Sequence, residues 1–166
     1  MNDRVQLEFR PPDPPLQVVL VEPQIPQNTG NVARLCAATG TVLHLVEPLG
    51  FEITDAKLKR AGLDYWDAVD VMYYPSLDAF LESSGDEARL HLFSTRAPAS
   101  YTDCRFQPGD FLLFGSETKG LAQPLLDRHP DAVFGIPILL DNVRSLNLST
   151  SVGIIAYEAL RQIDCF

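Results

Sequence analysis

The sequence predicts an α/β protein with a mostly parallel six-stranded sheet and helices on both of its faces. Short apolar runs alternate along the chain with stretches of helical periodicity, and this order of strand, helix, strand, helix is typical of a parallel sheet with crossover helices. The length of 166 residues favours one domain. In such sheets ligands bind beyond the carboxyl ends of strands, so the segments that follow the strands deserve the closest inspection.

The expected elements follow from these patterns. Strands are predicted from the apolar runs at 17–22, 41–47, 71–74, 89–94, 110–115 and 132–137. Helices are predicted at 29–39, 54–61, 76–83, 121–127 and 147–162. In the first helix Val32, Leu35 and Cys36 recur at helical spacing, and Gly40 ends it. Residues 1–16 contain four prolines and no periodic pattern, so we expect a flexible tail before a single domain at 17–166.

Composition narrows the class of protein. Apolar residues make up 46% of the chain, enough for a sizeable core, and no run approaches eighteen consecutive apolar residues, so no membrane span is expected. The N-terminus lacks the apolar centre of a signal peptide, which predicts a cytoplasmic protein. Three scattered cysteines and three scattered histidines predict neither disulfides nor a metal site.

The net charge of −9 opposes nucleic-acid binding, which usually relies on a basic surface. The charge is nevertheless uneven, because Lys57, Lys59 and Arg60 form a basic cluster. Local patches matter more than the total, since salt screens charges that are more than about 10 Å apart.

Three strands are followed by unusually polar segments. They read PQIPQNTGNVAR (23–34), GSETKGL (115–121) and PILLDNVRSLNLSTS (137–151). In the first, Asn28 or Thr29 could simply cap the helix, and Arg34 could be an ordinary solvated residue or could hold a phosphate with two hydrogen bonds. The second is either a surface loop or a loop whose glycines bring its backbone to a ligand, and its spacing is not that of a Walker A loop.

The third segment carries more small polar residues than a helix cap needs. One of Ser145, Asn147, Ser149, Thr150 and Ser151 could cap the last helix. The surplus suggests a loop that faces a ligand and could read an adenine edge. The chain has no GxGxxG after its first strand and no GxSxG, which argues against a dinucleotide-binding dehydrogenase, the common class of methyltransferase and an α/β-hydrolase.

Together, in this order and spacing, the three segments resemble the motifs of the SPOUT superfamily of RNA methyltransferases. The similarity is greatest to the family that methylates the ribose 2'-hydroxyl at the wobble position of tRNA, on a cytidine or a carboxymethylaminomethyluridine, and it covers about residues 17–163. The resemblance implies a C-terminal trefoil knot, which general topology rules would have rejected. It also implies S-adenosylmethionine as cofactor, tRNA as substrate, and a homodimer with the first and last helices in its interface.

The resemblance also implies roles for individual residues. The cofactor-binding positions map to Phe93, Thr95, Gly115, Glu117, Gly120, Ile136, Ser145, Leu146 and Leu148. Arg34 and Asn28 are the catalytic candidates, and Tyr157, with Asn28, is a candidate for the dimer interface. Candidates for RNA contacts are Lys57, Lys59, Arg60, Lys119, Arg144 and Arg161. The family often has Arg where this chain has Lys119.

Methyl transfer to a ribose oxygen is an in-line displacement that requires the two reacting atoms about 3 Å apart and aligned. A guanidinium stays protonated in proteins, so we assign Arg34 to clamping the adjacent phosphate and stabilising negative charge, and no metal is required. Three alternatives remain: a related enzyme acting on another tRNA or rRNA site, a non-catalytic module that binds RNA or cofactor, and an unrelated α/β nucleotide-binding protein.

Overall fold

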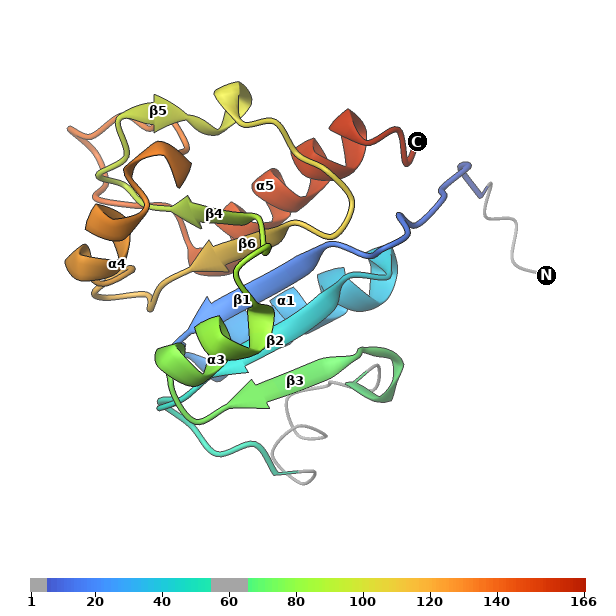
Figure 1. Cartoon of the computed structure of the whole chain (residues 1–166), viewed down its shortest axis with the longest axis horizontal. Helices are drawn as coiled ribbons and strands as arrows, with labels where there is room; N and C mark the ends of the chain where they lie inside the picture. The colour runs from blue at the N-terminus through green and yellow to red at the C-terminus, as the bar shows by residue number, and fades with distance from the viewer. Residues whose placement is uncertain (1–5, 55–65) are drawn as a thin grey trace.

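A computed structural model describes residues 6–54 and 66–166. Its sheet has the order β3-β2-β1-β6-β4-β7-β5, and all neighbouring strands in this order run parallel (Figure 1). The strands are β1 (Gln17–Val21), β2 (Val42–Val46), β3 (Val71–Tyr74), β4 (Leu90–Phe93), β5 (Ala99–Ser100), β6 (Phe111–Phe114) and β7 (Val133–Gly135). The parallel α/β class is therefore confirmed.

Within the described residues the sheet has seven strands rather than the six that the sequence predicts, and the additional strand is β5. It consists only of Ala99 and Ser100, which pair with Phe134 and Gly135 at the edge of the sheet. A strand of two residues without a large apolar side chain gives no periodic signal, which is why the sequence did not reveal it.

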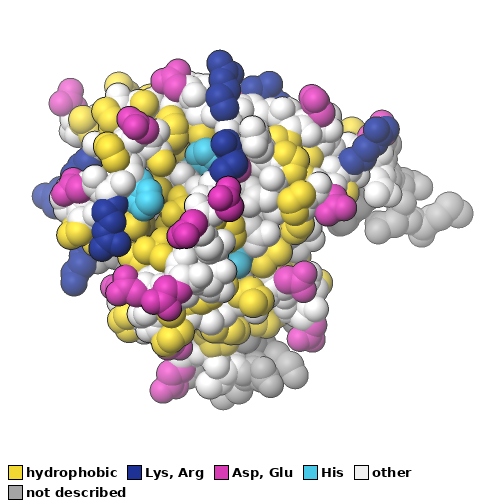
Figure 2. Space-filling view, viewed as in Figure 1, with side chains coloured by type: hydrophobic (Ala, Val, Ile, Leu, Met, Phe, Trp, Pro, Cys, Tyr) yellow, Lys and Arg dark blue, Asp and Glu magenta, His cyan; other side chains and the backbone are white. Residues whose placement is uncertain are grey.

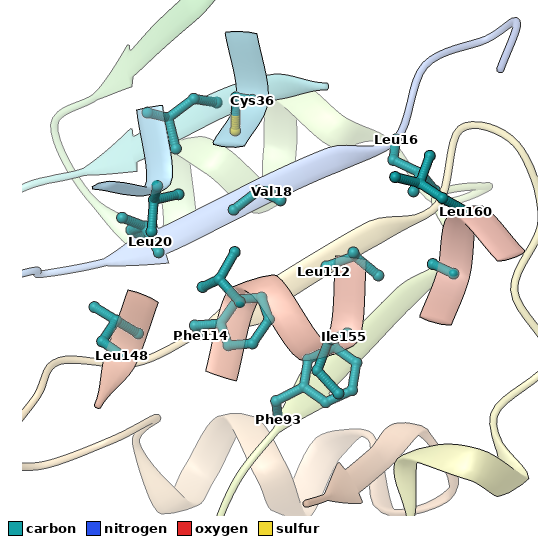
Figure 3. Packing of buried hydrophobic residues seen from close by; sticks show 14 of the residues in the cluster. Leu16, Val18, Leu20, Cys36, Phe93, Leu112, Phe114, Leu148, Ile155 and Leu160 are labelled. Carbon is teal, nitrogen blue, oxygen red and sulfur yellow. The ribbon is translucent and has the colours of Figure 1, made fainter. Parts of the chain in front are cut away.

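Helices cover both faces of the sheet, as predicted. The helices are α1 (Pro26–Thr39), α3 (Leu77–Ser84), α4 (Gln123–Arg128) and α5 (Leu148–Gln162). Side chains alternate across β1, so Val18 and Leu20 pack toward α1 and α5 while Val19 and Val21 pack toward α3 and α4. Figure 3 shows Leu148, Ile155 and Leu160 of α5 facing apolar side chains of the strands.

The helix ends follow from local sequence. Helix α1 begins at Pro26, three residues before the predicted start, because proline fits the first turn, where its missing N–H costs no hydrogen bond. It ends at Gly40, whose φ of 67° is left-handed and favours glycine. The helix predicted at 54–61 falls, apart from Thr54, outside the described residues, and so do Lys57, Lys59 and Arg60.

Residues 6–16 form neither helix nor strand, yet the end of this segment is packed. Leu16 is completely buried in the core, and the N–H of Arg10 donates a hydrogen bond of 2.9 Å to the carbonyl of Cys165. The packed part of the chain therefore begins before Gln17.

Among the helices that the structure describes, none has the length and apolar character needed to cross a membrane.

Sheet topology positions the site. From β1 the chain first builds β2 and β3 on one side, and it then crosses to build β4, β5, β6 and β7 on the other side. The two directions meet between β1 and β6, and a crevice at the carboxyl ends of the strands is expected there. In Figure 1 the arrowheads of β1, β2, β3, β4 and β6 all point to the left, so these ends lie on one side of the molecule.

Candidate functional site

A pocket of about 650 Å³ lies at the carboxyl ends of β4, β6 and β7. Its walls come from the loops that follow these strands, at 93–96, 114–120 and 135–148. Ile25 and Asn28 add the start of α1, and Ser151 adds the first turn of α5. Segments far apart in the sequence thus meet around one cavity, and its volume suits a ligand of ordinary cofactor size.

All the residues that the resemblance assigns to cofactor binding line this one pocket. They are Phe93, Thr95, Gly115, Glu117, Gly120, Ile136, Ser145, Leu146 and Leu148. The aromatic rings of Phe93 and Phe114 stack beneath it with centroids 5.0 Å apart. The polar segments after three different strands are therefore parts of a single site.

Glycines allow the 115–120 loop to close on itself. A Cβ atom on Gly115 would lie 1.9 Å from the carbonyl carbon of Gly120 and 2.1 Å from the nitrogen of Leu121. Gly120 itself has a left-handed φ of 67° and donates its N–H to the carbonyl of Ser116 at 2.9 Å. The pocket wall here is bare backbone, and no larger residue fits at position 115 unless the loop moves.

The carboxylate of Glu117 fastens this loop to the start of α1. Its oxygens accept hydrogen bonds from the N–H groups of Gln24 at 2.7 Å and Ile25 at 3.0 Å, and from Nδ2 of Asn28 at 3.1 Å. Helix α1 has no side-chain cap at Ile25, and Glu117 instead holds the backbone that leads into the helix. Burial opposes ionisation of this carboxyl, but these hydrogen bonds outweigh it and hold the pKa of Glu117 below its usual range.

Asn28 extends this connection to α5. While Nδ2 of Asn28 donates to Glu117, Oδ1 accepts a hydrogen bond of 2.9 Å from Nδ2 of Asn147. Asn147 in turn caps α5, because its Oδ1 accepts from the N–H groups of Ser149 at 2.9 Å and Thr150 at 3.3 Å. We call Glu117, Asn28 and Asn147 the amide relay. Asn28 is only 5% exposed, and its side chain is engaged within its own chain, while its expected roles in catalysis and at a dimer interface stay predictions.

The lysine and arginine residues expected to contact RNA do not all line the pocket. Lys119 and Arg144 line the pocket. Arg34 lies on an exposed part of α1 and outside the pocket lining of its own chain. Arg161 lies near the far end of α5, where its guanidinium pairs with Glu158 at 2.9 Å. Tyr157 is 46% exposed, and its ring contacts that of Phe166 at a centroid distance of 6.0 Å.

The sequence interpretation missed one charged residue of the pocket, Arg96. It follows β4 by three residues, and its side chain reaches the loop after β6. The signal was available, because the rule that directs attention to the ends of parallel strands applies to the strand at 89–94 as well. The polar run in FSTRAPAS has only three residues, Ser94 to Arg96, so this loop was less conspicuous than the three longer segments.

A second polar cluster contains a thiol, an imidazole and a carboxylate. Nε2 of His91 lies 2.7 Å from Oδ2 of Asp110, and Sγ of Cys104 lies 3.2 Å from Nδ1 of His91. All three residues are buried, and none of them lines the pocket. Burial and the nearby carboxylate of Asp110 raise the pKa of Cys104 to about 12, so the thiol stays protonated at neutral pH.

Within residues 6–54 and 66–166, no three His, Cys, Asp or Glu side chains gather as a group that could hold a metal ion.

Most of the chain is similar to known proteins. Residues 15–157 match the model of the SpoU rRNA Methylase family. A protein of Burkholderia pseudomallei (strain 1106a) named tRNA (cytidine(34)-2'-O)-methyltransferase is 50% identical over 147 residues, which are 87% of this chain and 94% of the relative. A protein of the same name from Burkholderia ambifaria is 48% identical over 147 residues, with the same shares of the two chains.

A solved structure is similar to this chain in both sequence and fold. It is described as giving structural insights into the 2-OH methylation of C/U34 on tRNA, is 52% identical to this chain, and superposes with a TM-score of 0.83. The match covers 89% of this chain and 95% of that one. From the extent of the family match and the identity to these relatives, the chain belongs to the SpoU rRNA Methylase family.

Proposed function

We propose that this protein transfers a methyl group from S-adenosylmethionine to the ribose 2'-hydroxyl of nucleotide 34, the wobble position, in the anticodon loop of tRNA. The observation that carries the proposal is the gathering of the loops after β4, β6 and β7 around one pocket, in a chain about half identical to proteins named tRNA (cytidine(34)-2'-O)-methyltransferase.

The pocket fits the cofactor on physical grounds. Apolar side chains of Phe93, Ile136 and Leu148 offer a surface for the adenine ring, and the bare backbone at Gly115 permits close approach. The loop at 144–147 also lines the pocket, and its backbone N–H and carbonyl groups can read the edge of the base. When bound, the cofactor supplies an electrophilic methyl group on a positively charged sulfur.

Arg34 serves the RNA rather than the cofactor. A guanidinium keeps its proton, so Arg34 holds the phosphate beside the reacting ribose and stabilises negative charge on the oxygen as it attacks. Because Arg34 lies outside the pocket lining of its own chain, this role requires that a second copy bring its α1 to the pocket. Exposed aromatic side chains at Tyr157 (46%) and Phe166 (58%) on and beside α5 support such a homodimer.

Other parts of the expectation stay predictions. The trefoil knot and the cytoplasmic location belong to these, as does tRNA binding by Lys57, Lys59, Arg60, Lys119, Arg144 and Arg161. Methylation of another tRNA or rRNA site is the second candidate, and the description of the matching family as rRNA methylases favours it. The names of the two tRNA-specific relatives make position 34 of tRNA the first choice.

The direct experiment incubates the protein with labelled S-adenosylmethionine and bulk tRNA from a strain that lacks this enzyme. Mass spectrometry of nuclease digests then maps the methylated nucleotide. We expect 2'-O-methylation at position 34 and no label in ribosomal RNA. Label at another position of tRNA or in ribosomal RNA would select the second candidate, and binding of cofactor without transfer to any RNA would select a non-catalytic module.

The role of Arg34 is tested by Arg34→Ala. We expect normal affinity for the cofactor in calorimetry and at least about a hundredfold lower turnover, which is the scale of losing one charge-stabilising donor. Turnover within twofold of the wild type would remove Arg34 from the reaction.

The homodimer is tested by mixing two impaired proteins, Arg34→Ala and Gly115→Ala, at a cofactor concentration too low to saturate the Gly115→Ala pocket. If Arg34 acts on the pocket of the partner, hybrid dimers contain one intact site and activity returns after subunit exchange. Hybrids that form in native mass spectrometry but stay inactive would place Arg34 on its own pocket.

A further inference from the structure

The pocket has a positive charge in a protein whose net charge is −9. Its charged lining residues are Arg96, Lys119, Arg144 and Glu117. The only carboxylate among them, that of Glu117, already accepts three hydrogen bonds from the start of α1. Figure 2 shows Lys and Arg side chains, with some Asp and Glu among them, at its left edge, the side toward which the strands point in Figure 1. The site is therefore suited to an anion.

Arg96 is the cation of this group whose position the structure fixes. Its Nη1 donates to Oε1 of Gln123 at 2.9 Å, and its Nη2 donates to the carbonyl of Leu121 at 3.3 Å. Its backbone N–H donates to Oγ of Ser94 at 3.1 Å. The guanidinium is thus held between the loop after β4 and the start of α4.

These partners leave the charge of Arg96 unbalanced. A guanidinium has five N–H donors, and the two acceptors on Gln123 and Leu121 are neutral and occupy two of them. Among the described residues, Arg89 and Arg161 have a carboxylate within ion-pairing distance, whereas Arg96 has none. An oriented, exposed fork of this kind matches the oxygens of a phosphate.

We propose that Arg96 binds a backbone phosphate of the RNA substrate at the mouth of the pocket and positions the target nucleotide there. This inference rests on the proposed function, because it assumes that the anion is RNA. Arg96 is exposed to solvent. This favours as its ligand a polyanion that binds from outside the protein, rather than a small group enclosed in the pocket. Lys119 and Arg144 add charge beside it, while the neutral partners of Arg96 keep its fork in place.

The experiment measures equilibrium binding of a fluorescently labelled tRNA anticodon stem-loop at several salt concentrations. Arg96→Gln removes the charge and keeps a polar amide side chain. We expect about tenfold weaker binding near 0.1 M salt and a salt dependence that is shallower by about one phosphate contact. Arg96→Lys keeps the charge without the fork, so we expect the salt dependence of the wild type and at most about threefold weaker binding.

Two controls separate this role from a structural one. Arg128→Gln removes an exposed charge at the end of α4, outside the pocket lining, and is expected to leave RNA binding within twofold. Calorimetry with S-adenosylmethionine is expected to give the wild-type affinity for Arg96→Gln, because the proposal assigns Arg96 to the RNA and not to the cofactor. An equal loss of RNA affinity in the Arg96→Gln and Arg128→Gln proteins would overturn the proposal.

Two further results would also contradict it. Unchanged RNA binding with weakened cofactor binding would place Arg96 on the carboxylate of the cofactor, and unchanged binding of both would leave it no role in recognition. Because binding of the stem-loop is measured without turnover, its result is independent of methylation. If binding of the stem-loop depends on Arg96 but the wild-type protein methylates no tRNA, the proposed function is refuted and the role of Arg96 in RNA binding is not.

Discussion

Gly115 is the residue at which the pocket leaves least room for change. A methyl group there would lie 1.9 Å from the carbonyl carbon of Gly120, a distance that no van der Waals contact permits. We expect Gly115→Ala to displace the 115–120 loop and to weaken cofactor binding at least about tenfold, as measured by calorimetry. Gly153→Ala is the matched control, since nothing lies within 4 Å of the added methyl group in α5. Normal affinity in the Gly115→Ala protein would contradict the assigned pocket.

His44 makes the stability of the protein depend on pH. Burial lowers its pKa to about 4, and its ring nitrogens lie 2.6 Å from Oε1 of Gln17 and 3.1 Å from the hydroxyl of Tyr74. The unfolded chain therefore binds a proton more readily than the folded one between pH 6.5 and about 4, so stability falls as the pH falls through this window.

From these values we expect the free energy of unfolding to decrease by about 2 kcal/mol between pH 7 and pH 5. Urea titrations at the two pH values measure the difference. His44→Gln cannot titrate in this range and should show a much smaller decrease. An equal decrease in both proteins would assign the pH dependence to other groups.

At the residue scale the sequence predicted which residues line the pocket but not what each one does. The resemblance placed Glu117 in the cofactor site, and it does line the pocket. Its carboxylate, however, binds the backbone of Gln24, which lies 93 residues earlier. No local pattern reports a hydrogen bond over that separation, because it depends on how the two loops pack. Arg96 was missed although the position of its loop pointed to it.

At the scale of elements, the start of α5 depends on Asn147. Its side-chain oxygen accepts two backbone hydrogen bonds of the first turn, and its nitrogen holds Asn28. Removing a helix cap costs about 0.5–2 kcal/mol, and loss of the bond to Asn28 adds to this. We expect Asn147→Ala to lower the free energy of unfolding by about 2 kcal/mol in urea titrations. Asn142→Ala, at an exposed loop position, should change it by less than about 0.5 kcal/mol.

Elements were predicted well where the pattern is local. The apolar runs identified six strands, and α5 begins within one residue of its predicted start. The order of the strands was not predicted, because pairing joins segments such as β1 and β6 that lie far apart along the chain. The edge strand β5 was not predicted for a different reason, because a strand of two residues has no periodicity.

For the whole molecule, the packed part of the chain begins before the first strand. Leu16 is fully buried, and Arg10 is bound to the carbonyl of Cys165 near the other end of the chain. We expect a chain that begins at Gln17 to be less stable by about 2–5 kcal/mol, the usual cost of emptying a buried leucine site. Thermal and urea unfolding against a chain that begins at Gln6 measures this. Equal stability would show that residues 6–16 add nothing to the fold.

The total charge of the molecule was a poor guide to its chemistry. A value of −9 argues against an RNA substrate, yet three of the four charged residues that line the pocket are cationic. Charge composition counts every residue equally, whereas folding gathers particular side chains at the ends of β4, β6 and β7. The fold, which composition does not determine, therefore decides the sign of the local field.

The amide relay has a consequence for how this sequence can vary. Asn28 gives a hydrogen bond to Glu117 and receives one from Asn147, so each partner fixes the chemistry that the next must have. Aspartate at position 28 would set two carboxylates against each other, and glutamine at position 117 would turn a donor toward the N–H groups that its carboxylate now satisfies. Mutational effects at the three positions are therefore epistatic, with a double mutant costing less than the sum of its parts. Homologous chains should change these positions together or not at all.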